Sequence, residues 1–111
     1  MYVPDRGHLV YVNFSPQTGH EQLGIRPAIV LSPKSFNHTT GFALVCPITR
    51  KQKGYPFEVK LPTRLGVEGV ILTDQIKSLD WKARQFSYKG IAANDVVDDC
   101  LQLINTILNY K

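Results

Sequence analysis

The sequence predicts a single small domain that is mainly β and is closed by one C-terminal helix. At 111 residues the chain is long enough for one hydrophobic core but not for two. Short apolar runs, separated by glycine, proline and polar residues, fill most of the chain up to residue 89. Helical spacing of apolar residues appears only after residue 94. Together these observations favour a small antiparallel sheet that curls into a half-barrel, spanning residues 1–111 as one domain.

The first two strands are expected on either side of a long loop. Residues 7–14 alternate between two sets of side chains, which is typical of a half-buried strand. Residues 15–24 are polar and contain a proline and two glycines, and long loops of this kind often carry function. Pro27 is expected to open the second strand, residues 28–32, because a missing N–H is tolerated at the first residue of a strand.

The middle of the chain predicts further strands and a basic connection. Residues 36–41 are expected to form a turn that contains Asn37, and residues 49–56 form a connection rich in lysine and arginine. Strands are expected at residues 42–48, 57–61, 69–73 and 75–79, with an edge strand at 85–89.

The last segment predicts an amphipathic helix. Its apolar residues fall on one stripe at spacings of three and four, namely Val97, Leu101, Ile104 and Leu108, with Val96, Cys100, Leu103 and Ile107 beside it. Asn94 is the expected N-cap. The acidic residues Asp95, Asp98 and Asp99 lie in the first turns, where the helix macrodipole favours negative charge.

The composition points to an anionic partner and to the cytoplasm. Thirteen Lys and Arg residues against nine Asp and Glu give a formal charge of +4, which favours nucleic acid as a partner. No apolar run approaches the length of a membrane span, and no export signal precedes the first strand. Cys46 and Cys100 are expected to be core residues. No spacing of cysteine and histidine indicates a metal or another cofactor.

One long signature and four further motifs, in order along the chain, then resemble a known family. Residues 19–32 read Gly-His-Glu-Gln-Leu-Gly-Ile-Arg-Pro-Ala-Ile-Val-Leu-Ser, and they are similar to the G-x-E-Q-x-G-x-R-P-A-x-V-L-S signature of MazF/PemK-type toxins. Further matches follow in order at Phe36-Asn37, at Cys46-Pro47-Ile48-Thr49, at Lys53-Gly54-Tyr55-Pro56-Phe57-Glu58-Val59, and from Gly69 through Asp74-Gln75-Ile76-Lys77-Ser78. The last two blocks resemble the MazF branch most closely, and the resemblance spans essentially the whole chain.

The resemblance implies a fold, an activity and partners. It implies an SH3-like barrel with added helices that forms a homodimer. It implies metal-independent cleavage of single-stranded RNA, chiefly messenger RNA, at short sequence motifs, with 2′,3′-cyclic phosphate and 5′-hydroxyl ends. A cognate antitoxin protein is expected to neutralise the toxin.

The resemblance also implies a catalytic set. Arg26 matches the catalytic arginine of the family, and its planar, permanently charged guanidinium suits a phosphate. Thr49 matches the catalytic threonine, whose hydroxyl can hold the reacting linkage in line. Glu21 is the carboxylate nearest to Arg26 in the sequence, and orienting the arginine, accepting a proton and contacting a base all stay open for it. None of the three histidines, His8, His20 and His38, is expected to be catalytic.

RNA binding is expected to involve cations interleaved with aromatic and amide side chains. Cations hold phosphates, and aromatic rings stack on bases in a single-strand binding groove. The residues expected to contact RNA are Asn37, Arg50, Lys53, Tyr55, Gln75, Lys77 and Arg84.

Two other classes of protein compete with this interpretation. CcdB-like toxins share the fold and inhibit DNA gyrase. Their C-terminal sequence is Trp-Gly-Ile, whereas this chain ends Leu108-Asn109-Tyr110-Lys111. A non-enzymatic SH3-like interaction module would give no reason for Arg26 and Thr49 to stand in their motifs. The loop after the first strand reads Ser-Pro-Gln-Thr-Gly at residues 15–19, where some relatives have Asp-Pro-x-Lys-Gly. That loop faces the substrate in the family, so the difference affects which short RNA motif is cut.

Overall fold

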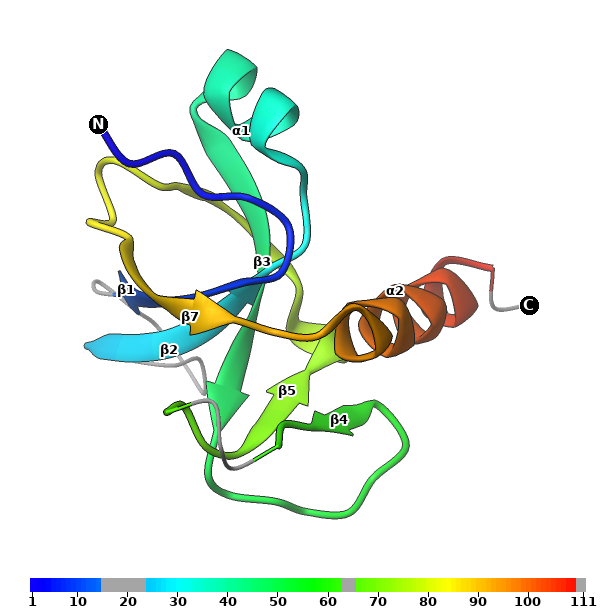
Figure 1. Ribbon diagram of the computed structural model, residues 1–111. Helices are drawn as coiled ribbons and strands as arrows, with labels where there is room; N and C mark the ends of the chain where they lie inside the picture. The colour runs from blue at the N-terminus through cyan, green and yellow to red at the C-terminus, as the bar shows by residue number, and fades with distance from the viewer. Residues whose placement is uncertain (15–23, 63–65, 110–111) are drawn as a thin grey trace.

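The computed structural model describes residues 1–14, 24–62 and 66–109. These residues form a curled antiparallel sheet with a short helix at one end and a longer helix at the C-terminus (Figure 1). The strands are β1 (His8–Asn13), β2 (Ile25–Val30), β3 (Phe42–Thr49), β4 (Glu58–Lys60), β5 (Val70–Leu72), β6 (Lys77–Asp80) and β7 (Ser87–Ile91). The helical segments are α1 (Lys34–Thr40), the 3-10 helix η2 (Thr73–Gln75) and α2 (Asn94–Leu108). The predicted mainly β fold with a C-terminal helix is therefore confirmed.

Strand β3 is the centre of the sheet. The strand order is β4-β5-β3-β2-β1-β7, and β6 also pairs with β3. Along one edge, β3 pairs first with β6 through Phe42–Val45 and then with β5 through Ile48 and Thr49. It runs from the end of α1 to the opposite end of the molecule, where β4 and β5 lie (Figure 1).

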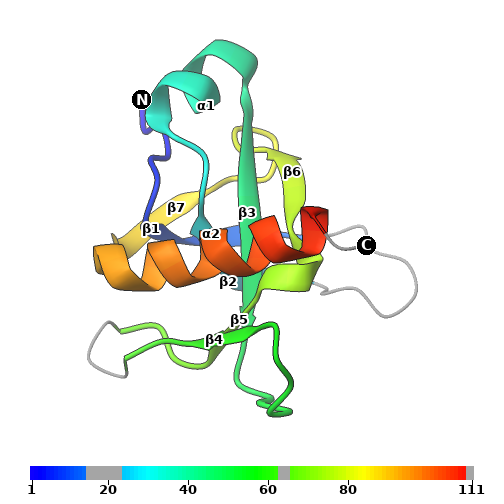
Figure 2. The ribbon, with the colours of Figure 1, turned by 90° about the vertical axis from the view of Figure 1, so that its right-hand side faces the viewer.

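Two hydrophobic clusters lie on the two faces of this sheet. Successive residues of a strand point to opposite faces, so Leu9 belongs to one cluster and Val10 to the other. The first cluster is covered by α2, which lies across that face of the sheet (Figure 2). Helix α2 adds Val97, Cys100 and Ile104 to it, and burial raises the pKa of the Cys100 thiol to about 12. Both cysteines are buried as expected.

Three expectations about element boundaries were wrong. Residues 34–40 form helix α1, where the sequence predicted a turn, and Gly41 ends this helix at a φ of 76°. Strand β2 begins at Ile25, so Pro27 is its third residue and not its opening one. The residue before α2 is Ala93, which has no side-chain cap, so Asn94 is not the N-cap. None of the helices among the described residues has the length and apolarity to cross a membrane.

Candidate active site

The candidate active site lies where strands β2 and β3 separate. Their register pairs Ala28 with Pro47, and the paired residues end there. The Leu31 N–H donates to the Leu44 carbonyl at 2.8 Å, and bonds from β2 to β3 recur at every second residue. Counting back from residue 31, the ladder expects its next N–H donors at positions 29 and 27. Pro27 has no N–H to donate, which explains why the ladder stops at this point.

Beyond the last pair, the same register brings two motif residues toward each other. Arg26 and Thr49 each lie two residues past the Ala28–Pro47 pair, and both line one pocket of about 380 Å³. The full lining of this pocket is Tyr11, Ile25, Arg26, Pro27, Ile48, Thr49, Arg50, Lys51, Gly66, Val67 and Glu68. The structure thus unites two predicted catalytic residues that come from different motifs.

The pocket surrounds the strand ends and combines apolar walls with charged groups. By strand alternation, Arg26 and Thr49 belong to the face of Ala28 and Val45, while Ile48 belongs to the face covered by α2. Arg26 is exposed and Thr49 is half-buried. A guanidinium at the surface and a hydroxyl close to the backbone are therefore both accessible from solvent at this end of the sheet.

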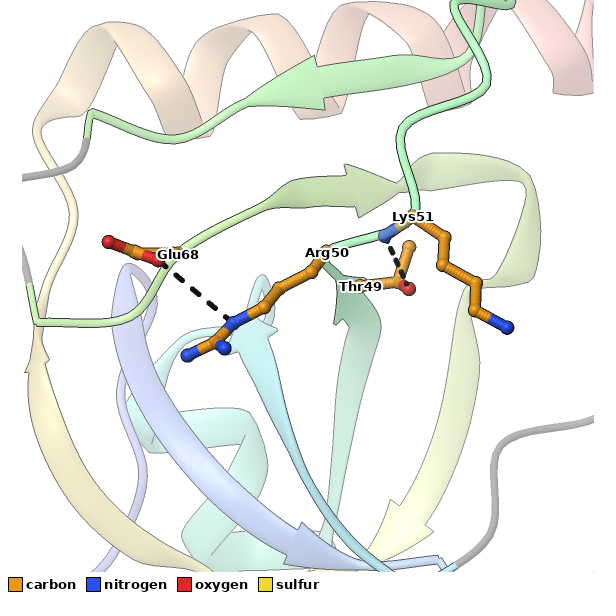
Figure 3. Close-up of polar contacts among 4 residues, drawn as sticks. All are labelled: Thr49, Arg50, Lys51 and Glu68. Atoms are coloured by element: carbon orange, nitrogen blue, oxygen red, sulfur yellow. Dashed lines mark hydrogen bonds and ion pairs between the residues drawn. The ribbon is translucent and has the colours of Figure 1, made fainter.

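The Thr49 hydroxyl is held by the chain that follows it. Its Oγ1 accepts a hydrogen bond from the Lys51 N–H at 3.2 Å (Figure 3). An oxygen that accepts from the backbone still has a proton to donate, so the hydroxyl can donate to an anionic oxygen in the pocket. Strand β5 supports the same point from the other side, since Thr49 pairs with Val70.

Two further cations follow Thr49 and point in different directions. Arg50 extends toward Glu68, with Nε 4.0 Å from the carboxylate, whereas the Lys51 side chain extends away from them (Figure 3). The Arg50 and Glu68 side chains are 83% and 56% exposed, and a pair this exposed contributes little stability. Arg50 can therefore exchange Glu68 for an anionic ligand at small energetic cost.

The basic connection between β3 and β4 is held by two carboxylates. Glu58 accepts hydrogen bonds from the Lys53 N–H at 3.0 Å and the Gly54 N–H at 2.9 Å. The Tyr55 hydroxyl donates to Asp74, and this bond raises the pKa of Tyr55 to about 12. These bonds fix the backbone that carries Lys53 and the position of the Tyr55 ring.

The other predicted cations lie beside the end of β1 that adjoins Arg26. Lys77 Nζ lies 5.9 Å from the centre of the Phe14 ring. The Arg84 guanidinium donates to the Asn13 carbonyl at 3.3 Å, and Asn13 pairs with Ile25, the neighbour of Arg26. Gln75 is half-buried in η2. Cations from several strands and loops thus surround one end of the sheet.

Asn37 is a correction to the predicted RNA-binding set. Its side chain has no exposed surface, and its Nδ2 donates to the carbonyls of Pro4 at 2.8 Å and Ser32 at 3.0 Å. Its Oδ1 accepts from the Ser32 hydroxyl at 2.5 Å, and its own carbonyl accepts from the Trp81 indole N–H at 2.8 Å. With every side-chain amide atom bonded inside the protein, Asn37 ties α1 to the chain around it, and its amide is not available to a base in this structure.

Glu21 and His20 lie outside the described residues. His8 has a structural setting, because its Nδ1 accepts from the Tyr2 hydroxyl at 2.7 Å and burial lowers its pKa. Tyr11 and Glu68 also line the pocket, and no local sequence pattern pointed to either of them. Both enter the site through the sheet topology, which a linear pattern does not show.

This fold and site define a class of small, β-rich protein with an arginine and a hydroxyl in a cation-lined pocket, which suits a phosphodiester. A sequence profile of the PemK-like, MazF-like toxins of type II toxin-antitoxin systems matches residues 5–108. The chain therefore belongs to this toxin family.

Characterised relatives agree with this assignment. The chain is 48% identical over 108 residues to the Escherichia coli (strain K12) endoribonuclease toxin MazF, covering 97% of this chain and 93% of the relative. It is 39% identical to the endoribonuclease toxin ChpB of the same organism, covering 94% and 93%.

Solved structures agree as well. The crystal structure of MazF from Deinococcus radiodurans matches with a TM-score of 0.93 and 51% identity, covering 97% of this chain and 98% of that one. A MazE-MazF complex from the same organism matches with a TM-score of 0.90 and 47% identity, covering 99% and 100%.

Proposed function

We propose that this protein is a metal-independent endoribonuclease toxin that cuts single-stranded RNA, chiefly messenger RNA, at short sequence motifs. The observation that carries the proposal is the placement of Arg26 and Thr49 on one pocket among further cations. Relatives that align with nearly the whole chain are named endoribonucleases. Messenger RNA as substrate puts the site of action in the cytoplasm.

RNA supplies its own nucleophile, so the protein needs no serine or cysteine for attack. The 2′-hydroxyl loses its proton and attacks the adjacent phosphorus, and the 5′-oxygen leaves and takes up a proton. The products are a 2′,3′-cyclic phosphate and a 5′-hydroxyl. Arg26 stabilises the negative charge that builds up on the phosphoryl oxygens, because its guanidinium stays charged at neutral pH. The Thr49 hydroxyl donates to a phosphoryl oxygen and keeps the linkage in line for attack.

Glu21 and the surrounding cations complete the proposed machinery. Glu21 orients Arg26 or accepts the proton of the 2′-hydroxyl. Arg50, Lys53, Lys77 and Arg84 hold flanking phosphates, Tyr55 stacks on a base and Gln75 reads a base edge. Contacts of this kind bind an extended strand at several nucleotides on either side of the cut.

A small antitoxin and a second copy of the chain are the proposed protein partners. The MazF proteins of Deinococcus radiodurans were solved in complexes with MazE. An antitoxin that covers the cationic end of the sheet would block RNA from the pocket. Gyrase inhibition is the less supported alternative, because the family match and the Arg26–Thr49 pocket both favour RNA cleavage.

Cleavage of a long single-stranded RNA in EDTA tests the proposal. The wild type should give discrete cuts with cyclic-phosphate ends. Arg26→Ala should lower kcat by about 10²–10³-fold, the effect of losing one donor to developing negative charge. Lys34→Gln removes one cation from α1, at the other end of β3, and should cut like the wild type. Uncut RNA with a folded wild-type protein would refute the enzymatic proposal and call for a gyrase supercoiling assay.

A further inference from the structure

We propose that Gly69 is a positioning residue that seats the peptide between Thr49 and Arg50, and this inference rests on the proposed function. Gly69 has a φ of 125°, a conformation that side-chain-bearing L residues rarely adopt. A Cβ at this position would overlap the Thr49 carbonyl oxygen, and it would lie 2.7 Å from the Thr49 carbonyl carbon and 3.2 Å from the Arg50 nitrogen. Only a residue without a side chain lets the backbone approach Thr49 this closely.

A backbone hydrogen bond and the adjacent strand pair restrain Gly69. Its carbonyl accepts a hydrogen bond from the Leu61 N–H at 3.0 Å, which ties it to the end of β4. The next residue, Val70, pairs with Thr49 in the β3–β5 ladder. The atoms that a side chain would strike are backbone atoms, which cannot rotate aside as the end of a long side chain can. We therefore expect a larger residue at position 69 to displace the Thr49–Arg50 peptide.

Such a displacement reaches the proposed reaction through the Thr49 hydroxyl. That hydroxyl accepts from the Lys51 N–H, so its direction depends on the peptides on both sides of Arg50. A misplacement of about 1 Å in a reacting group can lower the rate about 10²-fold. Substrate affinity depends on cations spread over several elements and should change little. Gly69 thus acts on turnover through Thr49 and does not touch RNA itself.

Gly41 provides a control for substitution at a positive φ where no neighbouring atom is struck. It ends α1 at a φ of 76°, and a Cβ there would meet no atom within 4 Å. Gly41→Ala therefore introduces the strain of a left-handed alanine without a contact to Thr49 or to any other pocket residue. The two glycines lie at opposite ends of β3. The comparison therefore distinguishes a general loss of stability from a displacement of the pocket.

The test is a double-mutant cycle between Gly69→Ala and Thr49→Ala on RNA cleavage, with Gly41→Ala as control. Circular dichroism first establishes that each variant is folded at the assay temperature. Gly69→Ala should lower kcat at least about tenfold and change KM less than about twofold, while Gly41→Ala keeps wild-type kcat. In the Thr49→Ala background, Gly69→Ala should lower kcat by no more than about threefold further.

Each other outcome has a definite meaning. If the two single effects multiply in the double variant, Gly69 does not act through Thr49 and the inference is overturned. A kcat for Gly69→Ala equal to that of Gly41→Ala overturns it as well. If Thr49→Ala alone cleaves like the wild type, the proposed role of Thr49 fails, and that result is separate from any result on Gly69.

A D-alanine at position 69, introduced by chemical ligation, replaces Gly69→Ala if that variant does not fold. A D residue favours a positive φ, and its Cβ occupies the position of the other α-hydrogen. A folded protein with wild-type kcat supports the requirement for free space on the Thr49 side. A folded protein with reduced kcat contradicts it.

Discussion

At the scale of single residues, Arg26 and Asn37 show what a motif reveals and what it hides. Both stand in motifs of the family, and both carry groups that bind RNA in other proteins. Arg26 lines the pocket, whereas Asn37 has no exposed surface. An amide that reads a base and an amide that holds a buried turn need the same donors and acceptors. The sequence could not separate these roles, because the partners of Asn37 include Pro4, which is distant in the chain.

Replacing Asn37 with alanine should reduce stability without reducing RNA cleavage by the folded protein. The substitution leaves the Ser32 hydroxyl and two buried carbonyls without their partner, which should lower the free energy of unfolding by about 2–4 kcal/mol. Urea denaturation measures this loss, and kcat/KM per folded molecule measures the function.

Gln75→Ala is the comparison for Asn37→Ala. Gln75 is the other amide side chain expected to contact RNA, but it is only half-buried. Its substitution should change the free energy of unfolding by less than about 1 kcal/mol. The structural role of Asn37 would be wrong if Asn37→Ala unfolded at the wild-type urea concentration while its kcat/KM decreased.

At the scale of elements, the strands and the long helix followed from the sequence, and the short helix did not. Apolar alternation located β1, a continuous apolar run located β3, and spacings of three and four located α2. Helix α1 contains Ser, Thr, Asn and His, which are weak helix formers, so propensity favoured a turn. Its helical form depends on Gly41 as C-cap and on the buried Asn37, and packing of this kind has no signature in a local pattern.

The connection between β3 and β4 is an element whose cations were predicted but whose support was not. Glu58 accepts from two successive N–H groups, and Asp74 accepts from Tyr55. A glutamate in a strand is ordinarily interpreted as a solvated residue. Only the fold of the loop back onto β4 brings the Lys53 and Gly54 N–H groups to this carboxylate, so the role of Glu58 becomes visible only in three dimensions.

Substituting Glu58 with glutamine should weaken RNA binding even though it makes the protein more positive. A side-chain amide has one acceptor oxygen and turns its NH₂ group toward an N–H that needs an acceptor. The loop then loses about 1 kcal/mol of support, and affinity should decrease about three- to tenfold. Fluorescence anisotropy with an RNA that carries 2′-deoxy nucleotides at the cut site measures this without cleavage.

The matched control for Glu58→Gln is Asp98→Asn, which removes one negative charge from an exposed position on α2. General electrostatics would strengthen RNA binding slightly and equally in both variants. Equal strengthening would contradict the proposed support of the loop by Glu58, whereas weakening confined to Glu58→Gln would agree with it.

At the scale of the whole molecule, six of the thirteen Lys and Arg residues lie around the end of the sheet where β2 and β3 separate. These cations come from β2, from β6 and from the connections between β3 and β4 and between β6 and β7, and they are Arg26, Arg50, Lys51, Lys53, Lys77 and Arg84. Helix α2 carries Asp95, Asp98 and Asp99 and has no Lys or Arg. The net charge of +4 was visible in the composition. The grouping of these six cations at one end was not, because it depends on the antiparallel order of the strands.

This grouping of cations predicts that the salt dependence of RNA binding originates at one end of β3. Each phosphate contact that a cation makes to a single strand contributes about −0.7 to the slope of log K against log salt concentration. Lys51→Gln removes an exposed cation from the pocket, so the slope should become less negative by about 0.7. Lys34→Gln removes an exposed cation from α1, which lies at the far end of β3 (Figure 1), and the slope should stay at the wild-type value.

Anisotropy titrations with the same deoxy-substituted RNA, between about 50 and 200 mM KCl, measure both slopes. The two variants have the same net charge, so any difference between them reports where the RNA lies and not how positive the protein is. Equal slopes for Lys51→Gln and Lys34→Gln would mean that the strand contacts the molecule without preference for either end. A smaller slope for Lys51→Gln alone would place the phosphates of the bound strand at the separated ends of β2 and β3, beside Arg26 and Thr49.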